Sequence, residues 1–216
     1  MESGELIHVF EGHGDDVNSV YFSPDSTRVV SRSRDGTVWV WSVETGELAF
    51  EPIECHGRVY CVRYSPSRDR IASGADSVQI WNAETGVGIL SIRGSSACSL
   101  AWTLNGTDII GGGFGLVTIW NSDGGERLRM WNAHGGSIRG LSLSPTATQL
   151  ATSNWWDKVA FVFDTSAGER TTSLKHDQQV QTIAFSRPGR VRRQQALVLV
   201  GSPRMRRPAT LPRREL

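Results

Sequence analysis

Residues 12–41 have the sequence GHGDDVNSVYFSPDSTRVVSRSRDGTVWVW, and this stretch decides the fold. Two short runs rich in valine and aromatic residues, 17–22 and 38–41, are bounded by the turn-forming groups Ser23-Pro24 and Asp35-Gly36. Both runs are apolar on both faces, and helical periodicity is absent. The stretch therefore predicts short β-strands in a sheet that is covered on both sides.

The same order of residues recurs along the chain at a nearly constant spacing. The aromatic residue that ends each unit stands at Trp41, Trp81, Trp120 and Phe163, so the period is 40, 39 and 43 residues. A single four-stranded sheet of this kind cannot bury its two faces, so each unit needs its neighbours. We expect four repeats and part of a fifth, at about residues 10–50, 51–90, 91–130, 131–172 and 173–186.

These units resemble the WD-repeat β-propeller family, whose signature is a Gly-His pair, a serine or threonine in the second strand, a turn aspartate and a closing tryptophan. The resemblance covers about residues 5–186 and implies an all-β fold of about four full four-stranded blades plus part of a fifth. A leading strand is expected at residues 6–10. Seven blades would need about 285 residues at this period, so the chain of 216 residues predicts an open or incomplete ring.

The resemblance also implies a buried hydrogen-bond chain in each blade, a tetrad running from aspartate to histidine to serine to tryptophan. Unit three has Ser95 and Phe114 where the histidine and aspartate belong, and unit four ends in Phe163, which has no N–H. The residues assigned to these tetrads are His13, Ser31, Asp35 and Trp41, then His56, Ser73, Asp76 and Trp81, and finally His134, Ser153 and Asp157.

We expect the histidines to have a structural role and not to bind metal or take part in catalysis. The reason is that four of them occupy the same repeat position, namely His13, His56, His134 and His176. That position spreads them over different blades and leaves no convergent set of ligands or catalytic groups. The glycine-rich run 111–115 lacks a following helix and a Gly-Lys-Ser/Thr ending, so we expect a turn there and no phosphate loop. We expect no enzymatic activity, no metal and no small-molecule cofactor.

Recognition of other proteins or peptides is the expected function, that of an interaction scaffold or adaptor. In this family, partners commonly sit on the face that carries the loop before the first strand and the turn before the third. Arginine, tyrosine and tryptophan are enriched in binding hot spots, although each position is also compatible with an ordinary surface role. The candidate partner-binding residues are Asp16, Asn18, Arg34, Arg58, Tyr60, Arg139, Trp156 and Gln181.

The formal charge of +1 conceals a division of the chain. Residues 1–186 carry 14 basic and 21 acidic side chains, whereas residues 187–216 carry nine arginines and one glutamate. An alternative function follows from this basic, proline-containing tail, namely association with nucleic acid through phosphate contacts. The repeat pattern stops abruptly after Phe185-Ser186, which favours a different explanation, that residues 187–216 are disordered or are translated from an interrupted gene.

Cysteine usage and hydropathy bound the compartment. The three cysteines form no C-x-x-C pair, so neither a disulfide framework nor a zinc site is expected. No run approaches the roughly 18 apolar residues of a membrane helix, and the first five residues lack the positive region of a secretory signal. We expect an intracellular protein, cytoplasmic or nuclear, that does not enter a membrane.

Overall fold

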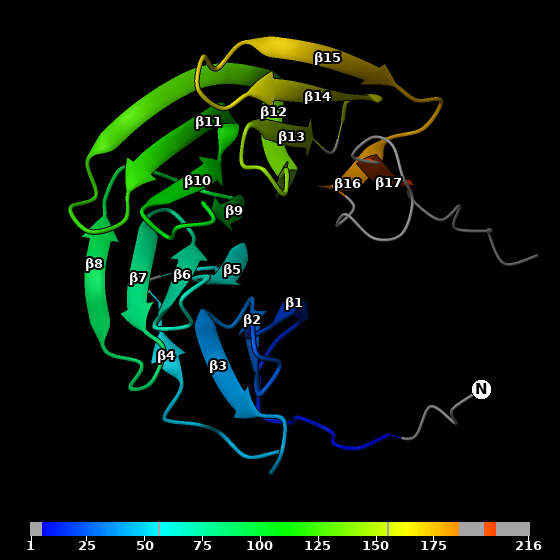
Figure 1. Cartoon of the computed structure of the whole chain (residues 1–216). Coiled ribbons are helices and arrows are strands. Elements are labelled where there is room, and N and C mark those ends of the chain that lie inside the picture. The colour runs from blue at the N-terminus through cyan, green and yellow to red at the C-terminus, as the bar shows by residue number, and fades with distance from the viewer. Residues whose placement is uncertain (1–5, 56, 155, 186–196, 202–216) are drawn as a thin grey trace, which may run out of the picture.

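A computed structural model describes residues 6–55, 57–154, 156–185 and 197–201 of the chain. All the regular secondary structure in these ranges is β-strand, and the strands form four sheets that follow one another along an open arc (Figure 1). The all-β, incomplete propeller expected from the repeats is therefore confirmed. Within the described ranges, no helix is long and apolar enough to cross a membrane.

The first two blades are four-stranded antiparallel sheets whose strands follow sequence order. The first contains β1 (Val17–Phe22), β2 (Arg28–Ser33), β3 (Thr37–Ser42) and β4 (Ile53–Glu54). The second contains β5 (Cys61–Tyr64), β6 (Arg70–Gly74), β7 (Val78–Asn82) and β8 (Gly88–Ile92). Both blades turn between their first two strands through a residue of left-handed conformation, Ser26 at φ 62° and Arg68 at φ 69°.

The third and fourth blades are joined in one seven-stranded sheet. Its strands are β9 (Ser99–Trp102), β10 (Asp108–Gly112), β11 (Phe114–Asn121), β12 (Arg127–Leu143), β13 (Gln149–Asn154), β14 (Val159–Asp164) and β15 (Arg170–Lys175). The cause is β12, a strand of 17 residues that pairs with β11 near its start and with β13 near its end. The outer strand of the third blade thus continues as the inner strand of the fourth.

A fifth blade is begun by β16 (Val180–Phe185) and β17 (Leu197–Gly201). Phe185 pairs with Leu197 in the same way as Phe22 pairs with Val29 in the first blade, so the two strands have the register of a blade's first hairpin. The sequence predicted only one strand here. The leading strand predicted at residues 6–10 is absent, because this segment forms no ladder with a described strand.

The core lies between neighbouring blades. Val30 of β2 and Val62 of β5 are fully buried in one cluster that joins the first and second blades. Ile80 of β7 and Leu100 of β9 occupy the corresponding cluster between the second and third blades. Because each blade buries its apolar face only against the next one, the stacking of blades supplies the hydrophobic stabilisation of the chain.

Candidate functional site

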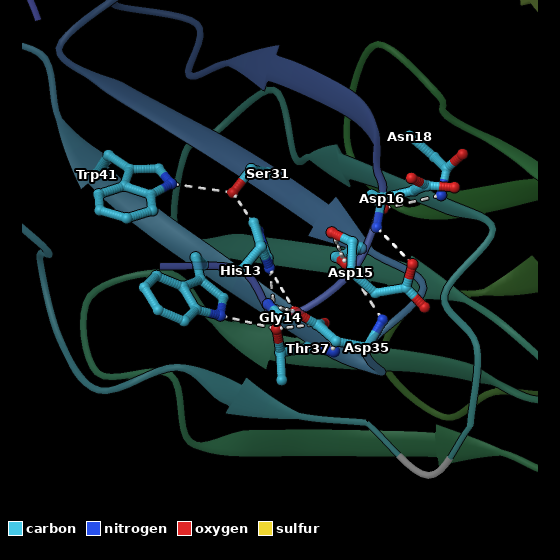
Figure 2. A network of polar contacts seen from close by, with 11 residues as sticks. His13, Gly14, Asp15, Asp16, Asn18, Ser31, Asp35, Thr37 and Trp41 are labelled. Atoms are coloured by element: carbon cyan, nitrogen blue, oxygen red, sulfur yellow. Dashed lines mark hydrogen bonds and ion pairs between the residues drawn. The ribbon is translucent and has the colours of Figure 1, made fainter. Parts of the chain in front are cut away.

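The tetrad of the first blade is a continuous chain of polar contacts (Figure 2). Trp41 Nε1–H donates to Ser31 Oγ at 2.9 Å, and Ser31 Oγ lies 2.8 Å from His13 Nε2. The other ring nitrogen, Nδ1, lies 2.9 Å from Asp35 Oδ2. Since an indole N–H can only donate, the serine hydroxyl is free to donate to Nε2, which leaves the proton on Nδ1 facing the carboxylate.

Two residues that the sequence analysis did not name extend this chain. Thr37 Oγ1 donates to Asp35 Oδ1 at 2.7 Å and accepts from Trp39 Nε1–H at 2.7 Å. Burial raises the pKa of Asp35, but hydrogen bonds from Thr37, His13 and the Gly14 N–H outweigh it and hold the pKa at about 2. The carboxylate is therefore ionised in the fold at neutral pH, as the acceptor of the whole network.

The second blade repeats the indole end of the chain. Trp81 Nε1–H donates to Ser73 Oγ at 2.9 Å. Asp76 lies beside Gly57, because its Oδ2 would be 3.8 Å from a Cβ placed on that glycine. His56 lies outside the described residues, so its predicted contact with Asp76 stays a prediction.

In the fourth blade, the predicted tetrad residue Ser153 is wrong, and Thr152 takes its place. His134 Nδ1 lies 3.0 Å from Asp157 Oδ2, but Nε2 faces Thr152 Oγ1 at 3.0 Å. Ser153 is the next residue on the strand, so its side chain points to the opposite face, where its buried hydroxyl has no partner among the described residues. Counting would have found Thr152, which follows Ser144 by eight residues just as Ser31 follows Ser23.

The third blade has no tetrad. The position that corresponds to Ser31 is Gly111, which pairs with Thr118 of β11 as Ser31 pairs with Trp39 of β3. A Cβ on Gly111 would clash with the ring of Trp120, so the indole occupies the space that a serine side chain fills elsewhere. This tryptophan is held by packing, and it is 3% exposed.

The predicted partner-binding residues gather where the inner strands begin. A β-bulge interrupts β1, β12 and β16 at Asn18, Arg139 and Gln181, and Tyr60 precedes β5 at the corresponding point. Bulges redirect side chains away from the sheet. Here, side chains of the second and fourth blades meet although the third blade lies between them. The Arg139 guanidinium lies 5.6 Å from the centre of the Tyr60 ring. We call this end of the blades the rim, which consists of the starts of the inner strands and the adjacent turns between second and third strands.

The other candidates lie on the same rim with different partners. Arg34 forms an ion pair with Asp16 at 3.3 Å. The Asn18 side-chain amide donates to the Asp16 carbonyl at 3.0 Å (Figure 2). Arg58 is exposed. Trp156 is 74% exposed, and its backbone N–H donates to the Asn154 side chain.

Two arginines that the sequence analysis missed lie beside these residues. Arg32 Nη1 donates to the Val59 carbonyl of the next blade at 3.0 Å, and the Arg63 guanidinium lies 4.7 Å from the centre of the Tyr21 ring. Burial lowers the pKa of Arg32, and the guanidinium groups of Arg63 and Arg139 lower it further. Neither Arg32 nor Arg63 forms an ion pair with a described carboxylate.

A signal for one of these arginines was present in the sequence. Arg63 interrupts an otherwise apolar inner strand, which is unusual for a strand covered on both faces. Phe114, which replaces the turn aspartate of the third blade, was also missed as a binding candidate and is 71% exposed. Within the described ranges, no group of three or more histidine, cysteine or carboxylate side chains is placed to hold a metal ion.

Comparison with known sequences agrees with this geometry. A profile of the WD domain, G-beta repeat, matches residues 4–42, 48–82 and 125–164, together more than half of the chain. The chain belongs to the WD-repeat family. The WD-repeat profile leaves out residues 83–124, which contain β9, β10 and β11 of the blade that lacks a tetrad. The gap in the match thus coincides with the three strands where the signature residues are missing.

Curated WD-repeat relatives are distant and longer. Protein hir1 of Aspergillus terreus is 26% identical over 184 residues, which cover 80% of this chain and 18% of the relative. WD repeat-containing protein SL1-17 of Schistosoma mansoni is 28% identical over 169 residues, 76% of this chain and 56% of the relative. Periodic tryptophan protein 2 of Arabidopsis thaliana is 25% identical over 188 residues, 83% of this chain and 21% of the relative. The chain thus spans about half or less of the length of these relatives.

Proposed function

We propose that this WD-repeat chain is a scaffold that holds an acidic segment of a partner protein at the rim, without catalysis. WD-repeat relatives support a general role in protein interaction. The observation that carries the site is that arginines of three blades meet beside Tyr60. Arg32 donates to the carbonyl of the preceding residue, Val59, the Arg139 guanidinium lies over the Tyr60 ring, and Arg63 follows in β5. Burial lowers the pKa of Arg32, the guanidinium groups of Arg63 and Arg139 lower it further, and a carboxylate-bearing ligand would relieve this repulsion.

Aromatic groups at the same rim provide the apolar part of the site. Tyr60 stacks under Arg139, while Phe114 and Trp156 are each more than two-thirds exposed. Exposed aromatic side chains next to arginine are the composition of binding hot spots. A partner segment that combines carboxylates with apolar residues would satisfy both sets of groups.

The test measures binding of the full chain to an array of synthetic peptides, acidic ones and their Lys-substituted counterparts. We expect the acidic peptides to bind, and Arg63→Ala or Arg139→Ala to weaken binding about tenfold or more, because truncating one partner of a buried charge pair costs about 2–5 kcal/mol. Arg127→Ala is the matched control, since Arg127 is an exposed arginine near the start of β12 and away from the rim. Equal binding by the rim variants and the control would overturn this site.

The nucleic-acid alternative gains no support from the relatives. The basic segment 187–216 that suggested it lies outside the described residues except for 197–201. Its prediction remains distinct, because phosphate contacts make binding steeply dependent on salt and removable by truncation of the basic segment.

A further inference from the structure

At the end of the blades opposite the rim, an arginine of one blade reaches into the next. Arg28 begins β2, and its guanidinium donates to the Ala83 carbonyl of the second blade at 2.8 Å and to the Glu84 carboxylate at 2.7 Å. Arg70 begins β6 and donates to the Ser122 carbonyl of the third blade at 3.3 Å and to the carboxylate of the following residue at 2.6 Å. Both arginine side chains are 27% exposed, so each fills space between two blades.

The third blade breaks this pattern with an aspartate. Asp108 begins β10 and has the register of Arg28 and Arg70, since each of the three pairs with the last residue of its blade's third strand. The acceptor in the fourth blade is Thr165, whose N–H donates to the turn between the first two strands, as that of Ala83 does. A carboxylate is shorter than an arginine side chain and cannot donate to a carbonyl, so Asp108 does not form the cross-blade bond.

A cleft lies at this junction of the third and fourth blades. Its volume is about 490 Å³, within the range of about 300–1,000 Å³ that is usual for small-ligand sites. The lining combines apolar side chains with polar groups of both blades, and it includes Ile110, Ile119, Leu128, Asp108, Arg129 and Thr165. Such a lining suits a ligand with an apolar stem and a polar head, which is the form of an arginine side chain.

The charges at the cleft favour a cation. The Asp108 carboxylate forms no ion pair with a described residue. Arg129 also lines the cleft, but its Nη1 donates to the Thr165 carbonyl at 3.0 Å. Hydrogen bonds from Ser166 lower the pKa of Asp164, and the Arg129 guanidinium lowers it further, so that carboxylate offsets the charge of Arg129. The charge of Asp108 is left for a ligand.

We propose that this cleft binds an arginine side chain of a partner protein, with the guanidinium on the Asp108 carboxylate and the stem on the apolar wall. The chain's own blades show the occupant, since Arg28 and Arg70 fill the corresponding position at the two preceding junctions. The Thr165 carbonyl has a second lone pair and is the acceptor that corresponds to the ones these arginines use. The site is separate from the rim and does not depend on the acidic ligand proposed there.

The test measures the binding of two blocked peptides to the full chain by isothermal titration calorimetry. One is acetyl-Ala-Arg-Ala-amide, and the other has citrulline in place of arginine, which keeps the shape and removes the charge. We expect the arginine peptide to bind about tenfold more tightly or better, because a charge-assisted hydrogen bond is lost with citrulline. Equal binding of the two peptides would overturn the proposal. Free arginine is titrated in parallel, and its binding more tightly than the peptide would overturn the assignment to a protein side chain.

Variants locate the binding at the cleft. Asp108→Asn removes the charge at nearly constant size and should weaken binding of the arginine peptide about tenfold. Asp108→Arg supplies the missing arginine from the chain itself and should abolish binding. Glu47→Gln is the matched control, since Glu47 is an exposed acid in the turn after β3. Thermal unfolding checks the fold of each variant, and Asp108→Asn decides if Asp108→Arg does not fold. Folded Asp108 variants that bind the peptide like the control would overturn the site.

Discussion

The first and third blades place a tryptophan at the same point of the sheet and hold it by different means. In the first blade, Trp41 ends a chain of hydrogen bonds through Ser31 and His13 to Asp35. In the third blade, the strand opposite carries Gly111, and the ring of Trp120 fills the space above it. Both rings are buried, at 5% and 3% exposure.

The difference teaches that the tryptophan site needs filled volume more than it needs the polar chain. A polar chain is stabilising only when every member has its partner, and a partly satisfied chain costs more than an apolar one. The third blade lacks the histidine, the aspartate and the serine together, so it leaves none of these polar groups buried without a hydrogen-bond partner. The fourth blade lies between the two, since it keeps His134, Thr152 and Asp157 but ends in Phe163.

Giving the third blade the serine of the first should have the largest effect. A Ser side chain at Gly111 would overlap the Trp120 ring, whose Cη2 lies 2.7 Å from the position of a Cβ there. We expect Gly111→Ser to lower the free energy of unfolding by about 1–3 kcal/mol, measured by denaturant titration, as overpacking does in buried cores. Gly135→Ala is the control, because nothing lies within 4 Å of a Cβ at Gly135. Equal midpoints for the two variants would contradict this account of the third blade.

Removing the hydroxyl from the first and fourth blades should separate them. Ser31→Ala leaves the Trp41 N–H and Nε2 of His13 without a partner, which should cost about 1–3 kcal/mol of unfolding free energy. Thr152→Ala leaves only Nε2 of His134 without a partner, because Phe163 has no N–H donor, so we expect a smaller loss of unfolding free energy. Thermal or denaturant unfolding measures both. A loss for Thr152→Ala that matches or exceeds that of Ser31→Ala would show that the indole adds nothing to the chain.

Acid should weaken the first blade through Asp35. Its pKa is about 2 in the fold and 3.8 ordinarily, so its contribution to stability is complete above about pH 4 and is lost as the pH falls toward 2. Asp35→Asn should reduce the loss of thermal stability over this window, relative to the wild type. The third blade offers no such dependence, since Phe114 stands at that position. Parallel pH profiles for the variant and the wild type would show that Asp35 does not contribute to the acid sensitivity.

The smallest effect on stability is expected at Ser153, which is next to Thr152, the residue that contacts His134 in the fourth blade. Its hydroxyl is buried without a partner among the described residues, so Ser153→Ala removes an unsatisfied group and no hydrogen bond. We expect the free energy of unfolding to stay within about 0.5 kcal/mol of the wild type or to rise. A clear destabilisation would mean that Ser153 has a function in the fold that its position in the sheet does not explain.

Much of the fold could be predicted because its signals are local. The Ser23-Pro24 turn, the spacing of the closing aromatic residues and the apolar runs between turns are all visible in one repeat and recur in the next. The site could be predicted only in part. Arg63 stands at no position of the signature and Phe114 replaces its turn aspartate, so the surroundings of both depend on how the blades stack.

The sequence by itself determined the order of the strands, the number of blades and the histidine–aspartate pair of the first and fourth blades, because turns and repeat spacing act over short distances. The structure showed that His134 meets Thr152 and not Ser153, a choice that the eight-residue spacing from Ser144 also indicates. The tertiary structure alone decided that Arg139 reaches Tyr60 across a whole blade and that a cleft lies beside Asp108. Those facts depend on the neighbouring sheets, whose packing no single repeat encodes.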